Sequence, residues 1–214
     1  MALLVVVLFT VVTVGFGWAF FEVLLGRIDG TVMVDNPEYP GEAFCQGSFE
    51  QPTFGDCDAP KEVERNVDTV ITDARGQFLG RFLLFPALGW LFSGFFLHVG
   101  SWLAGNEGTV KDSFAVAAWG LVPAAFSIVV LTAVLWFTFD PITVTPESDP
   151  EGFLEIAMAE LGAFETTATV LGLVSLAWSA YIHDAGLVAT RGVDRPQAFF
   201  IAGLLAFFGF IGIL

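Results

Sequence analysis

Ionisable side chains within the long apolar stretches of this sequence are the first candidates for chemistry. They are Glu22, His98, Glu160, Glu165 and His183. In a hydrocarbon environment such groups are costly, and where they occur they commonly relay protons or bind ions. Glu155, Glu160 and Glu165 are spaced five apart, which turns successive carboxylates by about 140° around a helix. They share no common face, so the spacing argues against a proton relay.

A structural explanation competes with the chemical one for each candidate. Glu22 lies close to Arg27 near the end of its apolar stretch, so we expect its carboxylate to snorkel to the membrane interface. We expect Glu160 and Glu165 at the external interface of the membrane. His98 precedes a glycine-bearing loop, and we expect it to cap helix carbonyls, with a position facing the lipid headgroups as the alternative.

No catalytic residue set is recognisable in the sequence. His183 and Asp184 end an apolar stretch and face Arg191 and Arg195, a pattern typical of a solvated charge cluster. The motifs of serine hydrolases, zinc proteases, P-loop proteins and dinucleotide-binding folds are missing. With only two histidines, a haem or multi-metal site is hard to build. The sequence therefore predicts no enzyme activity, no catalytic residues, no metal and no cofactor.

The two cysteines, Cys45 and Cys57, enclose a turn-rich acidic segment. We expect them to form a disulfide, which would stabilise this short loop by about 3 kcal/mol in the chain-entropy model. Two unpaired thiols and a metal site are the alternatives. A zinc site is disfavoured because no histidine lies near them.

Composition excludes a soluble domain. Apolar residues make up 55% of 214 residues and 24 of them are phenylalanine, and the mean hydropathy is +0.74. A soluble domain of this size could not bury so much apolar surface. The net charge is −15, with 23 acidic residues, eight basic residues and only two lysines. This balance favours a high-salt habitat, with an acidic partner-binding loop as the alternative, and disfavours nucleic-acid binding.

Five apolar stretches are long enough to cross a membrane. They cover 2–25, about 82–104, about 113–138, about 162–182 and about 196–214. The fold class expected is therefore all-α, an integral membrane bundle of about five transmembrane helices with an acidic extracellular loop after the first. Three regions follow: the first helix (1–25), the extracellular loop with the disulfide (26–81) and a four-helix transmembrane region (82–214). A cleaved signal peptide at 2–25 is disfavoured because a basic start and a small-residue cleavage site are missing.

The loops predict further elements and an orientation. Apolar residues recur at helical spacing over 63–78, which indicates an amphipathic helix on the membrane surface or over the bundle. Pro123 predicts a kink in the third span, and 154–164 is expected to extend the fourth span as a helix. Basic residues occur in the second-to-third and fourth-to-fifth loops but not in the third-to-fourth. By the positive-inside rule the N-terminus is cytoplasmic and the C-terminus extracellular, in the cell membrane.

Residues 95–139 carry a pattern of four features. In chain order these are a histidine before the end of a span, a G-x-x-G-T loop, a phenylalanine and an aromatic-x-x-x-Pro pair. They are His98, Gly105, Gly108, Thr109, Phe114, Trp119 and Pro123, and a later segment adds Trp178, Gly186, Leu187 and Ala198. This pattern resembles the Yip-type membrane proteins, named for Ypt-interacting protein, over residues 82–214. The resemblance implies a five-span helical bundle with a cytoplasmic N-terminus and an external or lumenal C-terminus.

These observations favour a non-enzymatic, Yip-like membrane protein that acts as a scaffold or assembly factor. Its environment is the lipid bilayer, and a protein partner or a second copy would bind through the helices or the extracellular loop. An accessory subunit of a larger membrane complex and a small-solute or ion transporter are the alternatives. Transport is disfavoured because the spans are almost wholly apolar; the third has only Ser127, Thr132 and Thr138 as polar residues past its first turn.

Overall fold

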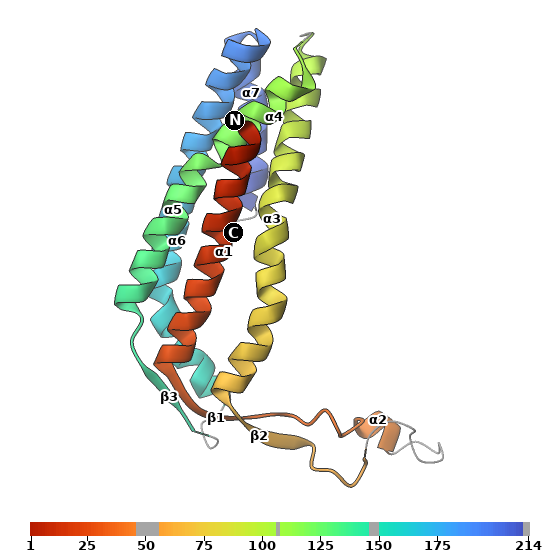
Figure 1. Ribbon diagram of the computed structural model, residues 1–214, viewed down its shortest axis with the longest axis vertical. Helices are drawn as coiled ribbons and strands as arrows, with labels where there is room; N and C mark the ends of the chain where they lie inside the picture. Colours follow the sequence, from red (N-terminus) through yellow and green to blue (C-terminus); the bar gives the residue numbers. More distant parts are fainter. Residues whose placement is uncertain (46–55, 106–107, 146–149, 212–214) are drawn as a thin grey trace.

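The computed structural model describes residues 1–45, 56–105, 108–145 and 150–211, with side chains described throughout except at 43, 150–161 and 163. A helical bundle with a small sheet at one end makes up the described part (Figure 1). Its elements in chain order are α1 (Ala2–Arg27), β1 (Ile28–Asp35), α2 (Glu42–Cys45), β2 (Glu62–Asn66), α3 (Val67–Leu103), α4 (Val110–Gly120), α5 (Val122–Thr138), β3 (Ile142–Val144), α6 (Pro150–Arg191) and α7 (Arg195–Ile211).

Four segments are long and apolar enough to cross a membrane, and a fifth is a shorter apolar helix. The four are α1, α3, α4 with α5, and the part of α6 over Phe164–Arg191; the shorter one is α7. Successive segments run in opposite directions, so the α3–α4 and α6–α7 turns lie at the end of the bundle away from the sheet (Figure 1). The predicted bundle of about five helices is confirmed. The predicted extension of the fourth span is also confirmed, because α6 begins at Pro150.

One predicted element differs from the structure. Val63 belongs to strand β2, and the helix expected over 63–78 begins at Val67 and continues without a break into the second span. The Asn66 side chain caps its start by accepting a hydrogen bond from the Asp68 backbone N–H. Phe78 and Phe82 pack against phenylalanines of α1. These contacts hold the helix upright beside α1, so it does not lie along the membrane surface.

A three-stranded sheet, in the order β2–β1–β3, was not expected from the sequence. Strand β1 pairs antiparallel with β2 and parallel with β3. Gly30 has φ +126°, and a Cβ at this position would overlap the carbonyl oxygen of Val144. Only glycine allows this conformation and this close approach of β1 to β3.

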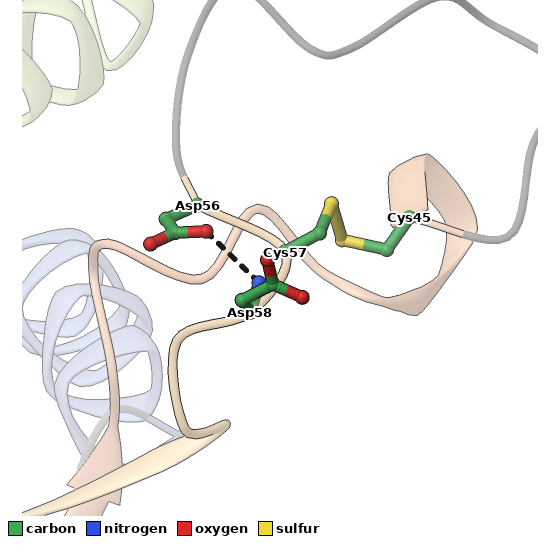
Figure 2. Close-up of a disulfide and its surroundings, with 4 residues drawn as sticks. All are labelled: Cys45, Asp56, Cys57 and Asp58. Carbon is green, nitrogen blue, oxygen red and sulfur yellow. Dashed lines mark hydrogen bonds between the residues drawn. A yellow bond between two sulfur atoms is a disulfide. The ribbon is translucent and has the colours of Figure 1, made fainter.

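The acidic loop is tied together by a disulfide and by polar contacts. Cys45, at the end of α2, is bonded to Cys57, with 5.6 Å between their Cα atoms (Figure 2). Next to the disulfide, the Asp58 N–H donates to the Asp56 carboxylate at 2.9 Å (Figure 2). Lys61 forms an ion pair with Glu42, and its hydrogen bond and positive charge lower the pKa of the Glu42 carboxyl.

Two apolar clusters lie at opposite ends of the bundle. The first packs α3, α4, α6 and α7 together and includes Leu97, Val116, Leu187 and Ile201. The second joins the ends of α1, α3 and α5 to the sheet; its members include Val23, Val67, Leu135, Ile142 and Val144. Many large apolar side chains along the spans are exposed, as expected for helices whose solvent is lipid.

Candidate functional site

The sequence motif residues fall into two groups in the structure. Most of them gather at the end of the bundle away from the sheet, on the last part of α3, the α3–α4 turn, α4 and α6. They are His98, Gly105, Gly108, Thr109, Phe114 and Gly186. Leu187 and Ala198 belong to this group too, buried in the apolar cluster at the same end. The other three are Trp119, Pro123 and Trp178, near the point where α4 meets α5.

The α3–α4 turn consists of the end of one helix followed closely by the start of the next. Gly105 has φ +83°, and its N–H donates to the Trp102 carbonyl at 3.0 Å, so it ends α3. Thr109 starts α4 through a capping box, in which its hydroxyl accepts from the Asp112 N–H while the Asp112 carboxylate accepts from the Thr109 N–H. The G-x-x-G-T pattern is thus a helix stop and a helix start.

Arg191, the last residue of α6, closes over this turn. Its side chain passes directly above Gly108, where an added Cβ would lie 2.5 Å from the arginine Cδ. Its Nη1 donates to the Thr109 carbonyl at 2.6 Å. The expected solvated charge cluster is therefore wrong for three of its four members, since His183, Asp184 and Arg191 are each at most 7% exposed. Packing of α6 against both α4 and α7 buries them. Asp184 lies 4.0 Å from the Arg195 guanidinium, and of the four only Arg195, at 79% side-chain exposure, is exposed.

Small residues bring α4 close to its neighbours. The Phe114 ring lies against Gly94 of α3, and its carbonyl accepts a hydrogen bond from Trp90 Nε1 at 2.9 Å. On the other side, Gly186 of α6 meets Val116, where an added Cβ would lie 2.7 Å from the valine Cγ1. Glycines at such contacts let membrane helices approach closely. These motif positions are therefore explained by packing.

The Yip1 domain family matches residues 1–214. The chain belongs to the Yip1 domain family. It is a multi-pass membrane protein, and the match also covers the first span and the acidic loop, beyond the region 82–214 where the motif resemblance lies. No curated protein and no solved structure matches the chain.

In this Yip1-domain protein the third span is broken into two helices, α4 and α5. The kink predicted at Pro123 is therefore confirmed. The chain turns at Leu121, and Pro123 lies in the first turn of α5. Serines of α6 bind the carbonyls at the break: Ser179 donates to Gly120 O at 2.7 Å and Ser175 donates to Pro123 O at 3.2 Å. In lipid a carbonyl at such a break has no water to bind, so the serine hydroxyls supply hydrogen bonds there.

Three residues of the motif resemblance make no packing contact of the kinds described above. Trp119 and Trp178 point outward, with 49% and 54% of their surface exposed. His98 is half-buried, and its Nδ1 has no hydrogen-bond partner among the described residues. Its expected role as a cap stays a prediction.

The remaining ionisable candidates lie toward the sheet end. Glu22 pairs with Arg75 of α3 at 3.1 Å, and the Arg75 guanidinium lies 4.3 Å from the centre of the Trp18 ring. Arg27, expected beside Glu22, instead donates to the Phe139 carbonyl and thereby caps the end of α5. Glu165 is exposed, while the side chains of Glu155 and Glu160 lie outside the described residues. Within the described ranges, no group of three potential ligand side chains could hold a metal.

Proposed function

We propose that this Yip1-domain protein is a non-enzymatic membrane scaffold that holds a protein partner through its acidic sheet and disulfide loop. One observation carries the proposal: the strands of the sheet connect to the ends of three spans, either directly or through a short loop. Strand β1 follows α1 directly, β2 runs directly into α3, and three residues separate α5 from β3. A partner bound to this sheet would act on all three spans at once.

The surface of this region suits a protein partner. Phe44 is 63% exposed on α2, beside the disulfide, and Met33 is 45% exposed on β1. An exposed apolar surface rimmed by polar residues marks a contact site, and we propose Phe44 and Met33 as the apolar members of such a surface within the acidic loop and sheet. The disulfide supports an external location for this loop, because disulfides persist outside the cytoplasm. The proposed topology therefore keeps the N-terminus cytoplasmic, with the protein in the cell membrane.

Transport is the weaker alternative. Polar side chains within the bundle mostly bind backbone carbonyls: Thr132 donates to Ile128 of its own helix, and Ser175 and Ser179 bind the α4–α5 break. A cavity of about 330 Å³ lies near that break, and two grooves of about 640 and 660 Å³ flank α7. None of the three is lined by Glu22, Glu165 or Thr132. An accessory subunit of a larger complex would use the same sheet surface as a scaffold.

Site-specific photo-crosslinking in native membranes tests the scaffold proposal. A photoreactive phenylalanine at Phe44 is expected to give one dominant protein adduct, which mass spectrometry identifies. The matched control is the same substitution at Phe95, which is equally exposed, at 63%, but lies on a span. That position is expected to give lipid adducts alone. Equal protein adducts at both positions, or none at Phe44, would contradict a partner surface on the loop.

A further inference from the structure

A groove of about 640 Å³ follows the seam between α6 and α7. Along α7 it extends from Arg195, the first residue of the helix, to Gly203. With a rise of roughly 1.5 Å per residue, this is a length of roughly 12 Å from the end of the bundle toward the middle of the membrane. The apolar span of α6 ends at Arg191, so Arg195 lies at the membrane interface. The groove therefore runs in the direction of the lipid chains.

Most of the groove is apolar and made of small residues. Alanines of both helices and Gly203 line it, and a Cβ added at Gly203 meets nothing within 4 Å. The side chains of Tyr181 and Phe199 also line it, and these residues are 65% and 72% exposed. Since exposed surface within a span is in contact with lipid, a hydrocarbon chain can enter the groove from the side.

The mouth of the groove carries a positive charge that a ligand can reach. Of the three hollows described above, only this one has charged side chains in its lining, Asp184 and Arg195. The Arg195 side chain is 79% exposed, and that of Asp184 only 10%. Nε of Arg195 lies 4.0 Å from Oδ2 of Asp184, which is beyond hydrogen-bond distance. The carboxylate therefore orients the guanidinium without taking up its N–H donors.

We infer that this groove binds an anionic phospholipid. The Arg195 guanidinium donates to the phosphate oxygens, because its planar fork of N–H groups matches a phosphate, and one acyl chain lies along the seam between α6 and α7. A headgroup cation finds no partner in the lining, since the Asp184 carboxylate is buried and faces Arg195. An anionic headgroup is therefore favoured over a zwitterionic one.

A second copy of the chain fits the groove less well. A symmetric contact through the groove would bring the Arg195 side chains of both copies toward each other at the same depth, where their like charges repel. The lipid site is independent of the partner surface on the acidic loop, which lies at the other end of the bundle (Figure 1).

Two variants test the two parts of the site, each with a matched control. Arg195→Gln removes the phosphate contact, and its control is Lys111→Gln, which removes an exposed positive charge of α4 outside the groove. Gly203→Leu fills the groove. Its control is Gly15→Leu on α1, where an added Cβ also meets nothing within 4 Å and none of the three hollows is lined.

Native mass spectrometry of the purified full chain in detergent counts the bound lipids and gives their apparent affinity. The probes are phosphatidylglycerol, phosphatidylcholine with the same acyl chains, and glycerol 1-phosphate, which has the phosphate but no chain. We expect one tightly bound phosphatidylglycerol per chain, with an affinity about tenfold higher than that of phosphatidylcholine. Arg195→Gln and Gly203→Leu are each expected to weaken its binding about tenfold, and the two controls to change it less than about twofold.

Several results would overturn the inference. Equal affinity for the two lipids, or equal losses in Arg195→Gln and Lys111→Gln, would mean that general surface charge attracts the lipid. Glycerol 1-phosphate bound as tightly as the lipid, or lipid binding unchanged in Gly203→Leu, would mean that the groove holds no acyl chain. A dimer that Gly203→Leu dissociates would mean that a second copy occupies the groove.

Discussion

A single guanidinium holds the turn between two spans at the end of the bundle away from the sheet. Arg191 reaches from α6 across Gly108 to the Thr109 carbonyl, and both the glycine and the capping box shape the turn that receives it. Charge-assisted hydrogen bonds of this kind are stronger than neutral ones. At the other end of the bundle, Gly30 allows β1 to approach β3. The first contact depends on the Arg191 side chain, and the second depends on Gly30 having no side chain.

Replacing Arg191 with lysine is expected to destabilise the protein by about 1–3 kcal/mol, because the shorter-reaching ammonium cannot reproduce the bond to Thr109 at the same position. Thermal unfolding in detergent measures the change. Arg195→Lys is the matched control, since the Arg195 side chain is 79% exposed, and its effect is expected within about 0.5 kcal/mol. Similar losses in both variants would argue against a specific bond at Thr109.

Gly30→Ala is expected to destabilise the sheet by at least about 1–3 kcal/mol, since it combines strain at φ +126° with a clash against Val144 O. The readout is hydrogen exchange of the β1 and β3 amides, which reports local opening. Gly41→Ala serves as the control because Gly41 also has positive φ, +94°, but a Cβ there meets nothing within 4 Å. Equal destabilisation in Gly30→Ala and Gly41→Ala would mean that backbone strain alone, and not the clash with Val144 O, causes the loss of stability.

At the scale of elements, two junctions determine how the spans fit together. One is the α4–α5 break, where α6 serines bind the carbonyls of Gly120 and Pro123. The other is the sheet, which fastens α1, α3 and α5 at one end through a shared apolar cluster. Neither junction lies within a single helix. Their stability is therefore a property of pairs of elements.

Ser179→Ala removes the donor to Gly120 O and is expected to cost about 0.5–2 kcal/mol, because a carbonyl inside the membrane loses its partner. Unfolding in SDS titration provides the measurement. Thr138→Ala is the control: its exposed hydroxyl bonds only to Val134 of its own helix, so a change close to zero is expected. A larger loss of stability for Thr138→Ala than for Ser179→Ala would contradict a specific role of the α6 serines at the break.

Replacing both Cys45 and Cys57 with serine is expected to loosen the acidic loop while the bundle stays intact. The lost loop-closure contribution is about 3 kcal/mol in the chain-entropy model, and it acts on α2 and its surroundings, which lie outside the bundle (Figure 1). Limited proteolysis is expected to cut the loop much faster, with the melting temperature of the helices nearly unchanged. A matching fall in that melting temperature would mean that the loop and bundle unfold as one unit.

Charge is distributed unevenly over the whole molecule. Of the 23 acidic residues, 18 lie in 26–81 and 140–165, together with five of the eight basic residues. The described parts of these two segments lie toward the sheet end of the bundle. The opposite end is close to neutral. Self-repulsion is therefore concentrated in one region, and the high-salt habitat that the composition suggests would screen it there.

We expect the melting temperature of the sheet region to rise when KCl is increased from about 0.1 M to about 1 M, as the Debye length falls from roughly 10 Å to roughly 3 Å. Glu62→Gln with Glu64→Gln, both exposed on β2, should raise the melting temperature at low salt and reduce its dependence on KCl. Hydrogen exchange of β2 at each concentration separates this region from the bundle. Hydrogen exchange of β2 that does not change with the KCl concentration would contradict the idea that the acidic residues are an adaptation to high salt.

The sequence alone determined the spans, the break at Pro123 and the disulfide, because each depends on a local property: apolar length, a missing N–H, or two cysteines a few residues apart. It also resembles the family to which the chain belongs. Only the tertiary structure decided that α3 is one upright helix, that β1 lies between β2 and β3, and that His183, Asp184 and Arg191 are buried. These features come from contacts between residues far apart in the chain, such as Arg191 with Thr109 and Gly30 with Val144, and no local pattern encodes which distant partner a residue meets.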